Sequence, residues 1–269
     1  MRLVTLTTDF GTRDPYVAQL KAVLYAGGAG SLQVLDLSHE LPAQDVREAA
    51  LFVAAALPRF PAGTIHVVVV DPDVGSARRA LAVRCGEQLC VGPDNGVLSL
   101  LFDRTTQAVE LDPVRLGISQ LSATFHGRDL FAPAAAALAR GTALEGLGQN
   151  LARGGAALVR LEFAVPAPEG TGFIGEVIHV DRFGNLITNL QRAQLAALSD
   201  NPTAESARGF ALTLRGRSSR LVGHYAEVPV GCLMAVVGSS DRLELAARNA
   251  SAAELTGARI GDRVRLERV

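Results

Sequence analysis

The stretch TIHVVVVD, residues 64–71, constrains the fold most, because it is apolar without alternation and rich in β-branched residues. A strand of this kind is buried on both faces, as in parallel sheets that carry helices on each side. β-rich runs alternate with helical patterns through the first half of the chain, which is typical of βα units. Helices are expected from Pro15 to Gly27 and over 43–57, 96–102 and 130–140. We predict an α/β N-terminal domain with a central, mainly parallel sheet.

The pattern changes around Val165, where VPAPEGTG is a Pro/Gly stretch typical of a linker. Beyond it, short strands at close spacing dominate, with one helical insert at QRAQLAALS. Such spacing favours a small antiparallel barrel or sandwich. We therefore expect an α/β domain over 1–165 and a smaller, mostly β, barrel-like domain over 166–269.

Charge and cysteine content limit the partners. The 26 basic and 27 acidic residues give a net charge of −1, which creates no global field that would attract nucleic acid or an anionic membrane. Three cysteines fit neither a disulfide framework nor a zinc pair, and favour reduced thiols in the cytoplasm. No apolar run approaches the roughly 20 residues of a membrane span, and the N-terminus reads as a strand. We expect a soluble, cytoplasmic protein with a small-molecule partner.

Two carboxylates stand where parallel strands end, and ligands of open α/β sheets bind beyond those ends. Asp9 follows TLTT, and it could equally cap the next helix. Asp71 follows VVVV, and Gly75 permits a tight turn that brings Arg78 or Arg79 back toward it. A strand-end turn with a surface ion pair is the competing interpretation.

Polar groups also cluster at three further places. His126 stands at a predicted helix entrance in TFHGRDLF, where a catalytic, water-holding or structural role is open. In VDRFGNLITN, Asp181, Phe183 and Asn185 surround a glycine turn that suits a flat heterocycle with polar edges, although a hairpin with a core Phe looks the same. The stretch from 238 to 254 offers further polar groups. No HxH or HExxH spacing occurs, so no metal site is indicated.

Seven stretches in order resemble the S-adenosyl-L-methionine hydroxide adenosyltransferases, the adenosine-forming hydrolases related to fluorinase and chlorinase. They are TTDFGTRDPYVAQLK, LSHELPAQDVREAA, IHVVVVDPDVGSARR, VGPDNGVLS, TFHGRDLFAPAAA, DRFGNLITN and SSDRLELAARNASAAE. The likeness covers nearly the whole chain. It implies attack of water or hydroxide on ribose C5′ of S-adenosyl-L-methionine, giving adenosine and L-methionine without a metal or other cofactor.

The resemblance also implies roles for particular residues. Asp71, Arg78 and His126 would hold the nucleophile, and Asp9 would accept hydrogen bonds from the ribose hydroxyls. The implied ligands of the rest of the substrate are Asp181 for the methionine ammonium, Ser240 for its carboxylate, and Phe183, Asn185, Arg248 and Ala250 for the adenosine. A homotrimer with sites between subunits is implied as well.

Two departures from the family pattern bear on turnover. The family usually reads DPGVG, whereas Asp73 occupies the glycine position here, and Asp241 stands where relatives often carry another residue. Asp73 could tolerate a left-handed backbone, raise the pKa of Asp71, or point into solvent. A protein that binds adenosine or S-adenosyl-L-methionine without hydrolysing it is therefore the alternative. A magnesium-dependent phosphatase reading of DPD fits poorly, because Lys21 is the only lysine.

Overall fold

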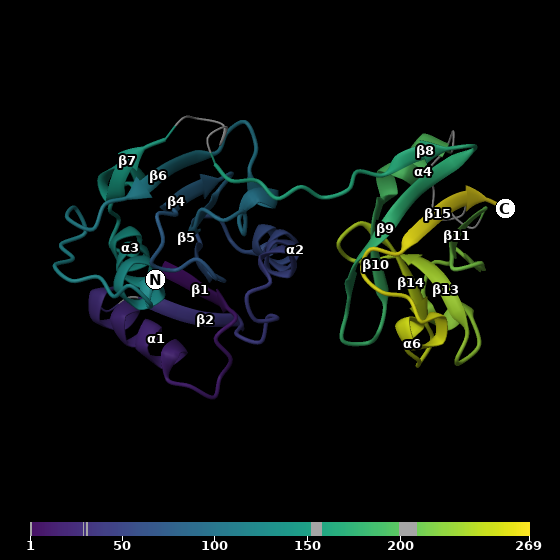
Figure 1. Cartoon of the computed structure of the whole chain (residues 1–269), viewed down its shortest axis with the longest axis horizontal. Helices are drawn as coiled ribbons and strands as arrows, with labels where there is room; N and C mark the ends of the chain where they lie inside the picture. Colours follow the sequence, from purple (N-terminus) through teal and green to yellow (C-terminus); the bar gives the residue numbers. More distant parts are fainter. Residues whose placement is uncertain (1, 29, 31, 152–157, 199–208) are drawn as a thin grey trace. The chain divides into compact units, whose positions relative to one another are not determined.

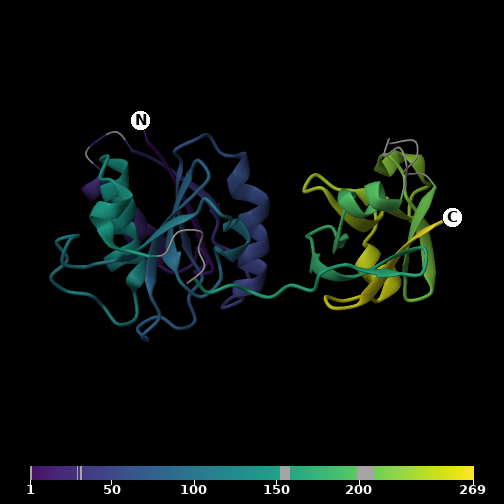
Figure 2. The same cartoon turned by 90° about the horizontal axis from the view of Figure 1, so that it is seen from above.

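The computed structural model describes residues 2–28, 30, 32–151, 158–198 and 209–269. It forms two compact units, Met1–Leu161 and Glu162–Val269 (Figures 1 and 2). The sequence placed the boundary after residue 165. Strand β8 (Ala167–Glu169) pairs with β9 (Gly172–Val180), and Asn189 Nδ2 donates to Ala164 O at 2.8 Å, so residues just before 165 are already joined to the second unit. In the part of the chain described, no helix is long and apolar enough to cross a bilayer.

The first unit is built on a seven-stranded sheet with the order β2-β1-β3-β5-β4-β6-β7. Strands β2, β1, β3 and β5 are parallel; β4 is antiparallel to β5 and β6, and β7 is antiparallel to β6. Five of the seven strands therefore run one way, as predicted. Their bounds are β1 Arg2–Thr8, β2 Leu32–Ser38, β3 Ile65–Val69, β4 Ala80–Cys85, β5 Gln88–Pro93, β6 Gln107–Leu111 and β7 Gly148–Asn150.

Helices cover both faces of this sheet (Figure 1). α1 (Tyr16–Gly27) and α3 (Ala132–Ala139) pack on one face, and α2 (Val46–Ala56) packs on the other. All five residues of β3 are buried, as its unbroken apolar pattern requires. The short helical turns are η1 Leu57–Arg59, η2 Ser99–Leu101, η3 Gly127–Phe131 and η4 Leu144–Leu147.

The helix expected over 96–102 is wrong, since only the single turn η2 forms there. Gly96 has a φ of +95°, and a Cβ at this position would lie 2.7 Å from Leu161 Cγ. Phe102 is already extended. The apolar residues that suggested a helix, such as Val97 and Leu98, are instead buried in the core from a short turn.

The second unit is a nearly closed antiparallel barrel, which confirms the mostly β, barrel-like prediction. Its strand order is β12-β11-β15-β9-β10-β14-β13, with β8 attached to β9. A bridge between Leu221 and Ala235 joins the two ends of this order. The remaining elements are β10 Leu186–Gln191, α4 Arg192–Leu198, β11 Phe210–Leu214, β12 Arg217–Arg220, η6 Tyr225–Glu227, β13 Leu233–Val237, β14 Arg242–Ala247, α6 Ala252–Thr256 and β15 Arg263–Arg268.

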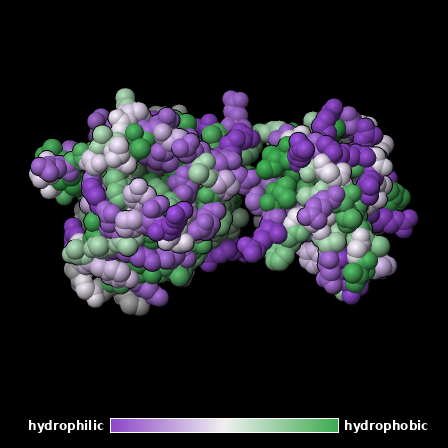
Figure 3. Space-filling view, turned by 60° about the horizontal axis from the view of Figure 1, so that its bottom comes forward, coloured by the Kyte–Doolittle hydropathy of each residue, from purple (hydrophilic) through white to green (hydrophobic). Residues whose placement is uncertain are grey.

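The surface of each unit is mixed in polarity. On the face drawn in Figure 3, hydrophilic and hydrophobic residues are interspersed over both units. The cysteines are reduced; Cys90 is buried, Cys85 is partly buried and Cys232 is exposed.

Candidate active site

Asp71, Arg78 and His126 meet beyond the end of β3. Arg78 donates from Nε to Asp71 Oδ1 at 2.9 Å and from Nη2 to Asp71 Oδ2. The same Nη2 lies 2.8 Å from His126 Nδ1. The Arg78 and Asp71 side chains are only 7% and 4% exposed. The two-point pairing holds the carboxylate in a fixed plane, and the guanidinium joins the strand end to a segment 48 residues away.

Gly75 makes this meeting possible. It has a φ of +83°, and a Cβ there would lie 2.2 Å from the carbonyl oxygen of Ala123. The 71–78 turn and the segment before His126 thus touch at a backbone with no side chain between them. A residue with a side chain would be strained by its φ and would push the two segments apart.

His126 stands directly before η3, a π-helical turn that continues into α3. Ala132 N–H donates to Gly127 O, the wider i to i−5 pattern. Pro133 follows and has no N–H to donate, which removes one α-helical hydrogen bond at this place. A Cβ at Gly127 would lie 3.5 Å from Phe10 Cζ, so this glycine packs closely against the Phe10 ring. The predicted helix entrance at His126 is therefore present, as a π-helical turn.

The hydrogen bond from Arg78 assigns the protonation of His126. Arginine has donors only, so Nδ1 must accept, and a neutral ring then carries its proton on Nε2. Burial lowers the pKa of His126, and the positive charge of Arg78 lowers it further, while the carboxylates of Asp71 and Asp129 oppose this. His126 is 9% exposed. It is thus a neutral ring that offers an N–H donor from Nε2.

Asp9 lies just after β1 and does not cap α1, whose N-cap residue is Pro15. Its Oδ2 accepts from Gln44 N–H at 2.8 Å, and Gln44 has a φ of +64°. Asp9 is partly exposed, so its second oxygen can serve a ligand.

The second unit contains a pocket of about 470 Å³. Its walls are formed by Phe183, Asn185, Tyr225, Ala247, Asn249 and Ala250. Phe183 is 74% exposed and Tyr225 is 46% exposed, so two aromatic rings are available to a ligand. This excludes the alternative of a core Phe at the glycine turn. Asn249 is one of the polar groups that the stretch from 238 to 254 offered, whereas Tyr225 was not predicted; its position as the sole aromatic in the polar loop GHYAEVP was the available signal.

Asp181 organises the turn beside this pocket. Its Oδ1 accepts from the N–H groups of Phe183 and Asn185 at 2.8 and 2.9 Å, and its Oδ2 accepts from Asn185 Nδ2 at 2.9 Å. These bonds fix the backbone of the turn that carries the exposed Phe183 ring. A carboxylate offers about four acceptor positions, so one remains for a ligand cation.

The other two predicted binding residues are not among the residues that line the pocket. Arg248 Nη1 donates to Val228 O at 2.8 Å and to Ala226 O at 3.3 Å, and thereby holds the loop that carries Tyr225. Ser240 is exposed in the turn between β13 and β14. Ala250, by contrast, lines the pocket.

Asp73 and Asp241, the two departures, behave differently. Asp73 is exposed and does not have a positive φ, so this turn needs no glycine at its place. Asp241 has a φ of +63°, and its Oδ1 accepts from Arg192 Nε at 2.7 Å.

The Asp94–Asn95 turn has a structural role. Asp94 pairs with Arg79 and accepts from Val159 N–H at 2.9 Å, and Asn95 Nδ2 donates to Val70 O at 2.9 Å. Among the described residues, no group of three or more His, Cys, Asp or Glu side chains could hold a metal ion.

The fold and the trio define an α/β unit joined to a β-barrel unit, with a buried Asp–Arg–His cluster at a strand end. Residues 4–148 match the SAM hydroxide adenosyltransferase N-terminal domain, and residues 175–265 match the C-terminal domain of the same family. The chain belongs to the SAM hydroxide adenosyltransferase family.

Known proteins agree with this membership. A Thermus thermophilus protein named (R)-S-adenosyl-L-methionine hydrolase is 43% identical over 99% of this chain and 100% of its own length. A crystal structure of an uncharacterized conserved protein from Thermotoga maritima superimposes with a TM-score of 0.87 at 29% identity, covering 98% of this chain and all of that one. A fluorinase from Actinoplanes is a more distant relative, 28% identical over 72% of this chain and 73% of its own.

Proposed function

We propose that the protein hydrolyses S-adenosyl-L-methionine to adenosine and L-methionine. The observation that carries the proposal is the single guanidinium of Arg78 that joins the Asp71 carboxylate to His126 Nδ1. The name and full-length similarity of the Thermus thermophilus relative support the substrate.

In the proposed reaction, a water oxygen attacks ribose C5′ as the bond from C5′ to the sulfonium sulfur breaks. The electron pair of that bond goes to sulfur, so methionine leaves as a neutral thioether and needs no acid. The water loses a proton, which passes to solvent. The enzyme has only to hold and align the nucleophile.

Each member of the trio has a task in this scheme. His126 Nε2–H donates to the water oxygen and points one of its lone pairs, while a carboxylate oxygen of Asp71 accepts one of the water hydrogens. Arg78 keeps both partners in place. Because the neutral His126 ring carries its proton on the side away from Arg78, it acts first as a donor, and Asp71 is the acceptor nearest to the water proton.

The binding residues divide the substrate among them. We propose that Asp9 accepts from the ribose hydroxyls and that Asp181 binds the methionine ammonium. Phe183 stacks on the adenine, with Asn185 and Ala250 at its edges, and Ser240 binds the methionine carboxylate. Arg248 contributes indirectly, because it holds the loop that bears Tyr225.

Incubating the purified protein with S-adenosyl-L-methionine and separating the products by chromatography tests the proposal. We expect adenosine and methionine in equal amounts, at a rate that falls ~10²-fold in the His126→Ala variant and stays within about twofold of wild type in an Arg79→Lys control. Tight binding of substrate without adenosine formation would overturn the enzymatic claim.

A binding protein without turnover is the second candidate, and Asp73 is the observation behind it. The substitution Asp73→Gly separates the two, because a binding protein would gain activity. Since Asp73 is exposed, we expect the rate to stay within about twofold of wild type, as for most surface substitutions.

We further propose a homotrimer that works in the cytoplasm with no cofactor and no nucleic-acid partner. Light scattering should then give a mass three times that of the 28.2 kDa chain. If sites draw on two subunits, mixing the impaired His126→Ala and Phe183→Ala proteins under exchange conditions should raise the activity at low substrate above that of either variant alone. A monomeric mass would contradict the trimer and leave the hydrolase proposal standing.

A further inference from the structure

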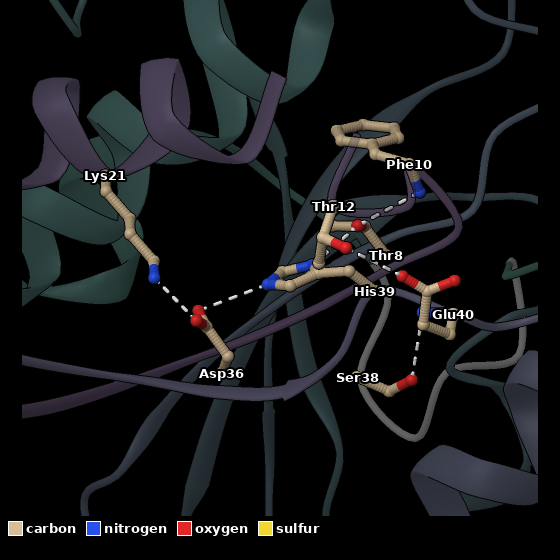
Figure 4. Close-up of polar contacts among 8 residues, drawn as sticks. All are labelled: Thr8, Phe10, Thr12, Lys21, Asp36, Ser38, His39 and Glu40. Atoms are coloured by element: carbon tan, nitrogen blue, oxygen red, sulfur yellow. Dashed lines mark hydrogen bonds and ion pairs between the residues drawn. The ribbon is translucent and has the colours of Figure 1, made fainter. Parts of the chain in front are cut away.

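A series of polar contacts, solvent-accessible at Lys21 and Asp36 and buried at His39 and Thr8, runs from α1 to the loop that carries Asp9 (Figure 4). Lys21 Nζ lies 2.5 Å from Asp36 Oδ2, and Asp36 Oδ1 lies 3.1 Å from His39 Nε2. On its other side, His39 Nδ1 lies 2.8 Å from Thr8 Oγ1, which accepts from Phe10 N–H at 3.2 Å. His39 is 5% exposed and Thr8 is fully buried. This series of contacts ends on Thr8 and Phe10, the two residues that flank Asp9.

The direction of the hydrogen bonds in this series of contacts follows from the groups at its two ends. Asp36 can only accept, and although burial alone raises its pKa, the contacts with Lys21 and His39 hold the pKa below its usual value. His39 Nε2 therefore bears the proton that faces Asp36. The geometry of this contact is that of an ion pair and does not meet the criteria for a hydrogen bond. In the tautomer with that proton on Nε2, Nδ1 accepts from the Thr8 hydroxyl. This leaves Thr8 Oγ1 free to accept from Phe10 N–H, as observed.

The backbone carbonyl of His39 makes a second contact with the loop that carries Asp9. Gly11 N–H donates to His39 O at 2.7 Å, and Gly11 has a φ of +66°. Residues on both sides of Asp9 are thus held by one histidine, once through its ring and once through its carbonyl. The next residues of the same segment reach the carboxylate itself, since Gln44 N–H donates to Asp9 Oδ2.

A bulge in the sheet creates this arrangement. The register of β1 and β2 shifts between Leu6, which faces Asp36, and Thr7, which faces Ser38. The extra residue in β2 re-aims the strand end and places the following His39 over Thr8. The mechanism described above uses none of these residues.

We infer that His39, through Thr8, is a positioning residue that fixes the Asp9 loop for recognition of the ribose hydroxyls, with Asp36 orienting the histidine ring. This rests on the proposed function, because Asp9 has its ribose role only there. No member of this series of contacts touches the substrate in this scheme.

The test compares two ligands by calorimetry: adenosine, and 2′,3′-dideoxyadenosine, which lacks the ribose hydroxyls. In wild type the ratio of their Kd values should be about 10 to 100, as expected when hydrogen bonds to a charged group are lost. The Thr8→Val variant keeps the size of the side chain and breaks the series of contacts. We expect it to reduce the ratio by about fivefold or more, through weaker adenosine binding alone.

Thr12→Val is the matched control. It removes an exposed hydrogen bond, Thr12 Oγ1 to Glu40 Oε1, between the same two segments without touching Thr8 or His39. Its ratio should equal that of wild type. Asp9→Asn should lower the ratio to about one, and adding Thr8→Val to it should have no further effect, because coupled sites are not additive. Asp36→Asn, which alters only the outer end of the series of contacts, gives a second readout with a smaller reduction.

A wild-type ratio in Thr8→Val, or equal losses in Thr8→Val and Thr12→Val, would overturn the positioning role while wild-type hydrolysis keeps the proposed function. A wild-type protein that neither binds adenosine nor forms it from S-adenosyl-L-methionine would overturn both.

Discussion

Replacing Arg78 by lysine keeps the positive charge and removes the planar guanidinium with its paired donors. Arg78 makes two side-chain hydrogen bonds to Asp71 and one to His126, and a lysine ammonium cannot reach all three acceptors in the same geometry. Hydrogen bonds to charged groups contribute about 1.5–3 kcal/mol each, so we expect Arg78→Lys to lower the free energy of unfolding by about 2–3 kcal/mol. Arg78→Met leaves the buried carboxylate without its cation and should cost about 3–5 kcal/mol.

In Arg78→Lys, kcat should also fall, by more than the loss of folded protein explains. Without the Nη2 donor, the His126 ring is no longer held with its proton on Nε2, and the Asp71 plane is free to rotate. A loss of about 2.7 kcal/mol in transition-state stabilisation is a ~10²-fold decrease in kcat. The assay is adenosine release at saturating substrate, with urea unfolding of the same samples.

Arg79→Lys is the control for this experiment. Arg79 forms a comparable pair with Asp94, with Nε to Oδ2 at 2.8 Å, in the neighbouring turn. It should lose stability and keep kcat within about twofold, because it lies outside the proposed machinery. A wild-type kcat in Arg78→Lys, or equal kcat losses in both variants, would refute the reasoning.

Four other outcomes are expected. Gly75→Ala should lower stability by about 1–3 kcal/mol and slow turnover, whereas Gly86→Ala, at a positive φ with open space, should lower stability only, as unfolding and adenosine release will show. Phe183→Ala should weaken adenosine binding by about 1–3 kcal/mol in calorimetry, the usual contribution of base stacking, and an unchanged Kd would remove it from the adenine site. kcat/KM should decrease as the pH falls through the lowered pKa of His126, since protonation at Nδ1 conflicts with the Arg78 donor; a flat acid limb would contradict the assigned tautomer. Burial lowers the pKa of His66 to about 4, below that of the unfolded chain, so the unfolded state takes up the proton first and stability should drop by up to about 3 kcal/mol between pH 6.5 and 4; His66→Asn should flatten that slope in urea titrations.

The sequence supplied the local parts of the site. A strand buried on both faces, ending in Asp71 and followed by a glycine turn, indicated that an arginine would fold back, and the structure places Arg78 there. The helix entrance at His126 and the glycine turn carrying Phe183 were equally local. These signals depend on residues within about one turn or one strand of each other, which is the range that periodicity and turn chemistry cover.

Contacts between distant residues could not be predicted from local patterns. The pairing of Arg78 with His126 spans 48 residues and was implied only by the family resemblance. The contact of Thr8 with His39 spans 31 residues, across a bulge whose register no pattern reveals, and was not predicted. The resemblance implies that Arg248 lies at the adenosine; the structure adds that its guanidinium binds the carbonyl oxygens of Val228 and Ala226, 20 and 22 residues earlier. The same loop carries Tyr225, which lines the pocket.

Isotope tracing tests most directly whether water attacks C5′ under the control of the trio. The protein is incubated with S-adenosyl-L-methionine in H₂¹⁸O, and the adenosine is analysed by mass spectrometry. One ¹⁸O should appear on the ribose 5′-oxygen, at a rate that falls ~10²-fold in His126→Ala. Adenosine without the label, or labelled adenosine formed equally fast by the variant, would contradict the account.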